Sequence, residues 1–251
     1  MMNQALSRVP HIIFLYWVIK IASTTLGETG ADMFSMTFDL GYGVTIAIFL
    51  SLFLLFFVVK MSLRRYEPFT YWLTFTATAI AGTAISDFID RTLGLGYAVG
   101  ALLLLALLIV ILTAWYKAEG SLSVENIRTP SAETFYWLAF LIANTLGTAA
   151  GDYLADDLEL GFLTSALLIG SILGVIVLLH FYTKVSTLVL FWIAFVLTRP
   201  FGATFGDLLT KDLDHGGLGF GTVNSSIVFA VILAVALYFE IQRKRESGRL
   251  I

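Results

Sequence analysis

Residues 16–32 read YWVIKIASTTLGETGAD, and the pattern of this segment recurs three more times along the chain. The other copies are residues 71–87, YWLTFTATAIAGTAISD, residues 136–152, YWLAFLIANTLGTAAGD, and residues 191–207, FWIAFVLTRPFGATFGD. In every copy a Gly lies 10 positions after the Trp, and an Asp lies 15 positions after it. A pattern repeated at fixed spacing indicates four copies of one supersecondary unit.

Each copy continues beyond its Asp with a turn and a second apolar run. The turn reads Leu-Gly-aromatic at residues 40–42, 95–97 and 160–162, and again at 218–220, where it is displaced by three extra residues. Each unit is therefore predicted to be a pair of helices, with approximate repeat boundaries of 10–61, 68–117, 132–182 and 187–242. The eight helices are expected at about 10–31, 42–61, 69–88, 97–117, 133–152, 162–182, 187–206 and 222–242.

The composition is that of a membrane protein. Hydrophobic residues make up 58% of the chain and charged residues 13%, whereas soluble domains are about half apolar and about a quarter charged. Apolar runs long enough to cross a hydrocarbon core of roughly 30 Å recur along the whole length. We therefore expect an all-α integral membrane protein with a single membrane domain over residues 1–251. The chain has no cysteine, which excludes disulfides and thiolate metal sites.

Basic side chains are distributed unequally between the two sides of the predicted bundle. Eleven Lys and Arg residues fall on the side of the N-terminus, whereas only Arg91 and Lys211 fall on the opposite side. Because basic loops remain in the cytoplasm, this bias predicts that both termini are cytoplasmic. Acidic residues are concentrated at the outer ends of the odd-numbered helices, where some, such as Asp39 and Asp214, are expected to be simply solvated.

The repeat brings one carboxylate per unit to a common depth. Each unit has an even number of helices, so all four copies cross the membrane in the same direction, with pseudo-fourfold symmetry about the membrane normal. The equivalent aspartates are Asp32, Asp87, Asp152 and Asp207. Small residues beside them allow helices to pack closely in lipid, and we expect this role for Gly27, Gly82, Gly147, Gly151, Gly202 and Gly206.

Four converging carboxylates need protons or a cation to compensate their charge. Oxygen ligands suit hard divalent cations such as Mn²⁺, Mg²⁺ or Ca²⁺. Glu28 lies one turn further in and is predicted to join the four aspartates as a metal ligand. Thr24, Thr83, Asn144 and Thr148 are predicted to line the substrate pathway. In the alternative interpretation, each Asp caps a short outer helix or bonds the turn backbone, and no ion is involved.

Two basic residues, Lys20 and Arg199, remain within the predicted spans. If the repeats close into a ring, Arg199 lies about one turn from the level of Glu28. We hypothesise a buried Arg199–Glu28 ion pair, and exchanging the two charges should then restore what either single reversal destroys. Lys20 is expected to snorkel to the cytoplasmic interface. The Tyr-Trp and Phe-Trp pairs are expected to be interfacial anchors or helix-packing residues.

In its Tyr-Trp, Gly and Asp positions, the chain resembles a bacterial family of uncharacterised membrane-anchored proteins, which is defined by a short repeat in several copies. The resemblance covers nearly the whole chain, and its fullest form is the first copy, Tyr16-Trp17-Val18-Ile19-Lys20 with Thr24-Thr25-Leu26-Gly27-Glu28 and Asp32. The later copies lack the Lys and the Glu, which argues against equal roles for these positions in all repeats. The resemblance implies a location in the bacterial inner membrane and a link to efflux of manganese or other divalent metals.

Together these patterns favour a secondary transporter that exports a divalent cation such as Mn²⁺ and couples export to protons, since protonated carboxylates release metal. One alternative is a non-transporting scaffold, and another is a transporter of a different cation or small solute. An enzyme is not expected, because the chain shows no nucleotide-binding loop, serine elbow or zinc-binding histidine pair. We expect the lipid bilayer and the cation as partners, no nucleic acid, and no cofactor besides the transported ion. Homo-oligomerisation stays open.

Overall fold

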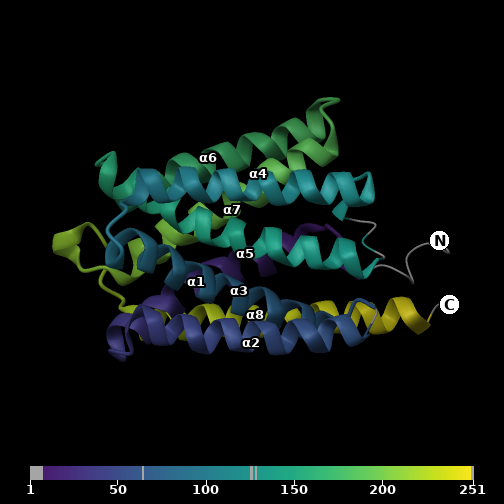
Figure 1. The fold of residues 1–251 in the computed structure, drawn as a ribbon, viewed down its shortest axis with the longest axis horizontal. Coiled ribbons are helices and arrows are strands. Elements are labelled where there is room, and N and C mark those ends of the chain that lie inside the picture. The colour runs from purple at the N-terminus through teal and green to yellow at the C-terminus, as the bar shows by residue number, and fades with distance from the viewer. Residues whose placement is uncertain (1–7, 64, 125–126, 128, 250–251) are drawn as a thin grey trace.

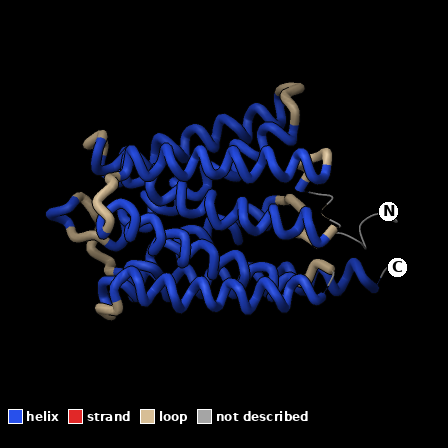
Figure 2. The backbone as a smooth tube through the Cα atoms, in the orientation of Figure 1, coloured by secondary structure: helices blue, strands red, loops and turns tan. Residues whose placement is uncertain are grey.

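The computed structural model describes residues 8–63, 65–124, 127 and 129–249, and all regular structure within them is helical. The long helices are α1 (Phe14–Asp32), α2 (Gly41–Leu63), α3 (Pro68–Asp87), α4 (Tyr97–Glu119), α5 (Pro130–Asp152), α6 (Gly161–Tyr182), α7 (Thr187–Thr210) and α8 (Thr222–Arg249). They run alongside one another over the length of the molecule (Figures 1 and 2). Arg64 and Arg128, two of the basic residues assigned to the cytoplasmic side, lie outside the described residues.

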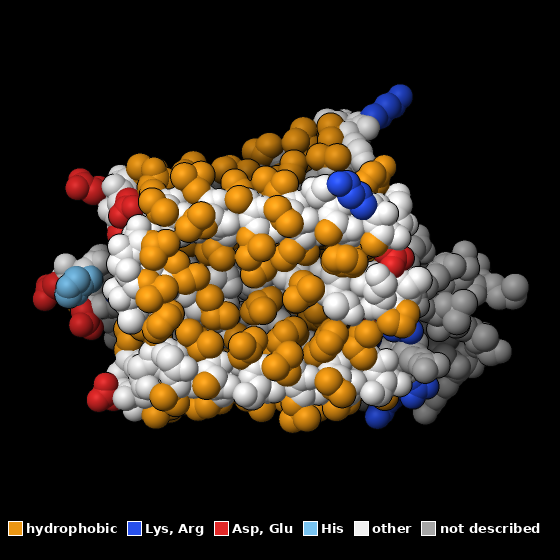
Figure 3. All heavy atoms as spheres, in the orientation of Figure 1, with side chains coloured by type: hydrophobic (Ala, Val, Ile, Leu, Met, Phe, Trp, Pro, Cys, Tyr) orange, Lys and Arg blue, Asp and Glu red, His pale blue; other side chains and the backbone are white. Residues whose placement is uncertain are grey.

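Six of these helices, α2, α3, α4, α6, α7 and α8, are long and apolar enough to cross a membrane. Figure 3 shows the apolar side chains spread over the flank of the bundle, as expected for a surface that faces lipid. The remaining two helices, α1 and α5, carry more polar residues and bury most of them against other helices. The chain is therefore a multi-pass membrane protein.

The four odd-numbered helices form a closed ring. α1 packs against α3 and α7, and α5 completes the ring by packing against the same two helices. Each even-numbered helix lies outside this ring on the first helix of the next repeat, so that α2 packs on α3, α4 on α5, α6 on α7 and α8 on α1. The four repeats are thus arranged cyclically, as the sequence predicts for parallel repeats.

Glycines set the spacing of the ring. The equivalent residues Gly27, Gly82, Gly147 and Gly202 each face the next helix so closely that an added Cβ would lie no more than 3.0 Å from one of its atoms. The residue met is always the one three positions before the next glycine: Ala79, Asn144, Arg199 and Thr24 in turn. Gly151 and Gly206 make similar approaches one turn further along. Any larger residue at the first four positions would push the helices apart.

The Leu-Gly-aromatic turns also have a common cause. Their glycines, Gly41, Gly96, Gly161 and Gly219, adopt φ values between 69° and 74°. This left-handed conformation is strained for residues with a Cβ, so glycine permits the chain to reverse there. Both described termini lie at one end of the bundle, and these turns lie at the opposite end, which we call the aspartate end (Figure 1).

At the end of the bundle that holds the described termini, a buried ion cluster joins three segments of the chain. Glu133 accepts hydrogen bonds from Arg8 at 2.6 Å and from Lys60 at 2.8 Å. All three side chains are buried. Arg8 and Lys60 therefore do not lie free in solvent as loop charges, and they join the segment before α1 to α2 and α5.

Most residues of the aromatic pairs are buried between helices. Tyr16, Tyr71, Trp72, Tyr136 and Trp137 are all at most 2% exposed, and the Tyr71 and Tyr136 hydroxyl oxygens lie 2.6 Å apart. Of the two interpretations of these pairs, helix packing holds and interfacial anchoring does not for these buried residues.

The expectation that Lys20 snorkels is wrong. Its side chain is 1% exposed, and its Nζ lies 3.6 Å from the centre of the Phe195 ring and 5.0 Å from that of Phe75. Phe75, Phe140 and Phe195 occupy the position of Lys20 in the other repeats. The lysine therefore points into an aromatic layer inside the ring, where cation–π attraction replaces water.

A candidate cation site at the aspartate end

One face of each ring helix points toward the common axis. On α1 this face carries Tyr16, Lys20, Thr24, Glu28 and Asp32, which follow one another at intervals of four residues. All five are buried. Residues four apart share a helix face, so the equivalent positions of the four helices form successive layers: aromatic, then mixed polar, then acidic at the aspartate end.

The four aspartates lie where each ring helix reaches the aspartate end, and each is 2% exposed. Three of them are followed by a single turn of π-helix: η2 (Met33–Thr37), η3 (Phe88–Thr92) and η5 (Tyr153–Asp157). Asp32, Asp87 and Asp152 stand at the start of these turns but make no side-chain capping hydrogen bond. The capping interpretation of these residues is therefore wrong.

The aspartates are held as two pairs, each around one basic side chain. Lys211 Nζ lies 2.7 Å from Asp32 Oδ2 and 3.2 Å from Asp207 Oδ1. In the other pair, Arg91 Nε lies 3.5 Å from Asp87 Oδ1, and its Nη2 lies 3.5 Å from Asp152 Oδ2. Each base stands four residues after its own Asp and reaches the Asp of the next repeat. The acidic layer thus has twofold rather than fourfold symmetry.

Lys211 lies just beyond the membrane-spanning part of α7, and its charge is strongly favoured. Burial lowers the pKa of Lys211, but the neighbouring carboxylates of Asp207 and Asp32 outweigh it and raise this pKa above its usual value. The ammonium form is therefore the form that occupies this position.

One of the two pairs has a third carboxylate. Glu28, Asp32 and Asp207 each offer an oxygen, and these three atoms lie within 4.8 Å of one another. A hard cation bound at about 2.3–2.6 Å holds opposing oxygens about 4.6–5.2 Å apart. The three residues therefore have the spacing and the chemistry of a divalent-cation site. Asp87 and Asp152, which we also predicted as ligands, belong to the other pair.

Arg199 occupies the ring axis next to Glu28, on the side away from the aspartate end. Its Nη2 lies 3.1 Å from Glu28 Oε2, so the ion pair hypothesised from the sequence is present. The same nitrogen donates to Thr148 Oγ1 at 2.7 Å and to Thr83 Oγ1, and Nη1 donates to the Thr24 carbonyl oxygen at 3.3 Å. Arg199 is 1% exposed. A guanidinium from the fourth repeat therefore contacts each of the other three.

The four residues predicted to line a pathway make contacts between the ring helices instead. Thr83 and Thr148 join the layer around Arg199, and their hydroxyl oxygens are 3.4 Å apart. Thr24 donates to the Thr198 carbonyl oxygen at 3.3 Å, and Asn144 donates to Thr78 Oγ1 at 3.0 Å. All four side chains are buried at ring interfaces, so the ring axis is closed by side chains at these layers.

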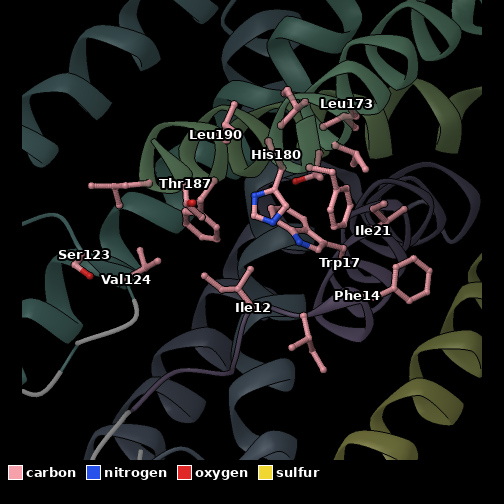
Figure 4. A pocket seen from close by; sticks show the side chains of 18 residues that line it. Ile12, Phe14, Trp17, Ile21, Ser123, Val124, Leu173, His180, Thr187 and Leu190 are labelled. Atoms are coloured by element: carbon pink, nitrogen blue, oxygen red, sulfur yellow. The ribbon is translucent and has the colours of Figure 1, made fainter. Parts of the chain in front are cut away.

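A separate cavity of about 540 Å³ opens between α1, α6 and α7. Figure 4 shows its lining, which is mainly apolar and includes Trp17, Leu173 and Leu190 together with His180. None of its described lining residues is acidic. The cavity is therefore unsuited to a divalent cation, and the candidate site remains at the aspartate end.

Reasoning from the sequence missed the roles of Arg91 and Lys211. A signal for both was present, since they are the only bases on their side and each follows a repeat aspartate by four residues. The corresponding residues of the other repeats, Met36 and Asp156, carry no positive charge. Aligning the residues after the aspartates would have shown that only the second and fourth repeats carry a base at this position.

Comparison with known proteins agrees with this repeat architecture. Among curated proteins and among solved structures, none matches this chain. A family model described as a repeat of unknown function, DUF347, matches residues 15–66, 70–121, 135–186 and 190–246. These four matches correspond one to one to the helix pairs of the ring. The chain therefore belongs to the DUF347 repeat family.

Proposed function

We propose that the protein is a secondary transporter that exports a divalent cation such as Mn²⁺ and binds it at Glu28, Asp32 and Asp207. In this proposal all eight helices cross a bacterial inner membrane with both termini in the cytoplasm, so the aspartate end faces outward. The basic side chains near the described termini and the acidic ones at the other end support this orientation (Figure 3).

The charge of the buried layer is the observation that carries the proposal. Five carboxylates, from Glu28, Asp32, Asp87, Asp152 and Asp207, meet three basic groups, from Arg91, Arg199 and Lys211. Lys20 faces aromatic rings instead. With every group ionised, two negative charges are uncompensated in a site of low polarity. Either a divalent cation or protons would reduce this charge, which is the basis for exchange of one for the other.

Flux of ions into liposomes containing the purified protein tests this function. We expect Mn²⁺-dependent quenching of an enclosed dye, lost in Asp32→Asn and Asp207→Asn and retained in Asp39→Asn, which alters an exposed turn residue. Equal flux in all four proteins would defeat the assignment of the site. Absence of flux for Mn²⁺, Co²⁺, Ni²⁺, Mg²⁺ and Ca²⁺ alike would defeat transport of these ions.

A scaffold is the competing function, and one observation favours it: each basic side chain at the aspartate end joins two neighbouring repeats. If the acids only hold helices together, Asp32→Asn should lower stability without any effect of divalent cations on the wild type. Thermal unfolding with and without Mn²⁺ separates the two functions, because a bound ion stabilises the folded state.

A further inference from the structure

Lys211 stands where a bound cation would stand. Its Nζ is within 3.2 Å of oxygens from Asp32 and Asp207, which are two of the three carboxylates of the candidate site. A metal ion bound to these oxygens and the lysine ammonium cannot occupy the same space. The third carboxylate, Glu28, is paired with the Arg199 guanidinium on the side away from the aspartate end. The site is therefore already filled by a side chain.

The turn that carries Lys211 differs from the other three. α7 continues to Thr210 without a π turn, and Lys211 then leaves the helix with extended φ and ψ of −70° and 151°. The three extra residues of the fourth repeat belong to the loop that follows. In this loop the Gly219 N–H donates to the Lys211 carbonyl oxygen at 2.9 Å. A Cβ on Gly217 would lie 2.0 Å from the same oxygen.

The extra residues thus form a loop folded around the backbone of Lys211, and the side chain is 24% exposed. The ammonium can consequently leave the carboxylates toward solvent without crossing the ring. The other basic residue of this end is placed differently. Arg91 lies in the η3 turn, and it also donates to the hydroxyl oxygens of Tyr97 at 3.0 Å and Tyr42 at 3.4 Å.

We propose that Lys211 is a tethered ammonium that occupies the cation site in the ion-free protein, and that a divalent cation must displace it to bind. This inference rests on the proposed function and adds the residue that controls access. Replacement of one positive charge by two lowers the uncompensated negative charge of the layer. A monovalent cation brings no such gain, so the lysine selects for divalent ions.

Arg91 supplies the matched control. By the twofold relation, its pair consists of Asp87 and Asp152, and the position of Glu28 is taken by Thr148. With two carboxylates instead of three, and with two tyrosine hydroxyls holding the guanidinium, this half binds no divalent cation of its own. Loss of Arg91 therefore removes the same charge from the layer as loss of Lys211 but uncovers no oxygen of the candidate site, so its effect on cation affinity measures the long-range electrostatic contribution alone.

The test is Mn²⁺ binding to the purified full-length protein by equilibrium dialysis at constant pH. A conformer with the lysine displaced that is populated at about 0.1–10% weakens the apparent affinity by the same fraction. Lys211→Met should therefore bind Mn²⁺ at least about tenfold more tightly than the wild type, and the gain in affinity for Arg91→Met should be clearly smaller. Equal affinity of Lys211→Met and wild type, or an equal gain in affinity for Lys211→Met and Arg91→Met, would overturn the role of the lysine while leaving the transporter intact. No Mn²⁺ binding to either folded protein would overturn both.

A second measurement uses only the wild type and so does not depend on folding of a variant. Mn²⁺ should increase the rate at which an amine-reactive reagent acylates Lys211, measured by mass spectrometry of the digested protein. Lys184, which is exposed at the other end, should react at the same rate with and without Mn²⁺. A Lys211 rate that is unchanged or lowered by saturating Mn²⁺ contradicts displacement.

Discussion

Replacement of Arg199 or Glu28 by Met tests the ion pair that joins the fourth repeat to the first. In Arg199→Met, the Glu28 carboxylate keeps only the hydroxyls of Thr83 and Thr148, at 3.4 and 3.5 Å. Such long hydrogen bonds compensate a buried charge poorly. Removing one partner of a buried ion pair costs about 3–5 kcal/mol, and we expect Arg199→Met at the upper end of this range.

The reverse change leaves a better-solvated charge. In Glu28→Met, Arg199 can still donate to Thr148 Oγ1 at 2.7 Å and to the Thr24 carbonyl oxygen at 3.3 Å. We therefore expect a cost near the lower end, about 3 kcal/mol. The double variant contains neither charge, so it should be less destabilised than either single variant. This corresponds to a coupling free energy of about 5 kcal/mol or more.

The assay is reversible unfolding in mixed micelles with increasing sodium dodecyl sulfate, with EDTA present so that bound metal adds no stability. Costs of the two single variants that simply add in the double variant would refute the reasoning. The structure also makes charge exchange a poorer test than double neutralisation. A glutamate at position 199 would face the Thr24 carbonyl oxygen, which can donate no hydrogen bond.

Three further predictions concern the ring, the buried lysine and the orientation. Gly82→Leu should lower the melting temperature in detergent strongly, because an added Cβ meets Asn144 at 3.0 Å. The control Gly43→Leu should change the melting temperature little, because nothing lies within 4 Å of an added Cβ there. Equal effects of the two substitutions would argue against close packing in the ring. Lys20→Met should be neutral or stabilising by about 1 kcal/mol, since Lys20 Nζ has no hydrogen-bond partner in the described structure; a large loss of stability would contradict this. The chain has no cysteine, so a single cysteine at Asp214 should react with an impermeant thiol reagent from outside intact cells, and a labelled cysteine at Lys184 instead would reverse the proposed orientation.

The parallel direction of the four repeats could be predicted from the sequence because it follows from repetition, whereas closure of the ring could not. Four copies with an even number of helices must run in the same direction, and Gly82 or Gly147 at equivalent positions must make equivalent contacts. The Arg199–Glu28 pair could be predicted only on the condition that the ring closes, since closure makes the first and fourth repeats neighbours. Contacts between residues far apart in the chain are normally hard to predict from one sequence, and here the repeat symmetry made some of them predictable.

What could not be predicted depends on departures from symmetry. The acidic layer divides into two pairs because only the second and fourth repeats carry a base four residues after the Asp, and because side-chain direction in that turn decides which neighbour Arg91 and Lys211 reach. The position of Lys20 was predicted wrongly because Lys20 was not compared with the equivalent residues of the other repeats. Its three counterparts, including Phe75 and Phe195, show that this position faces an aromatic layer inside the ring.

Anomalous diffraction from crystals grown with Mn²⁺ would locate the bound ion itself. We expect one strong manganese peak bound by carboxylate oxygens of Glu28, Asp32 and Asp207, with the Lys211 ammonium moved out toward solvent. A manganese peak away from these three carboxylates, or Lys211 still bridging Asp32 and Asp207 at saturating Mn²⁺, would contradict it.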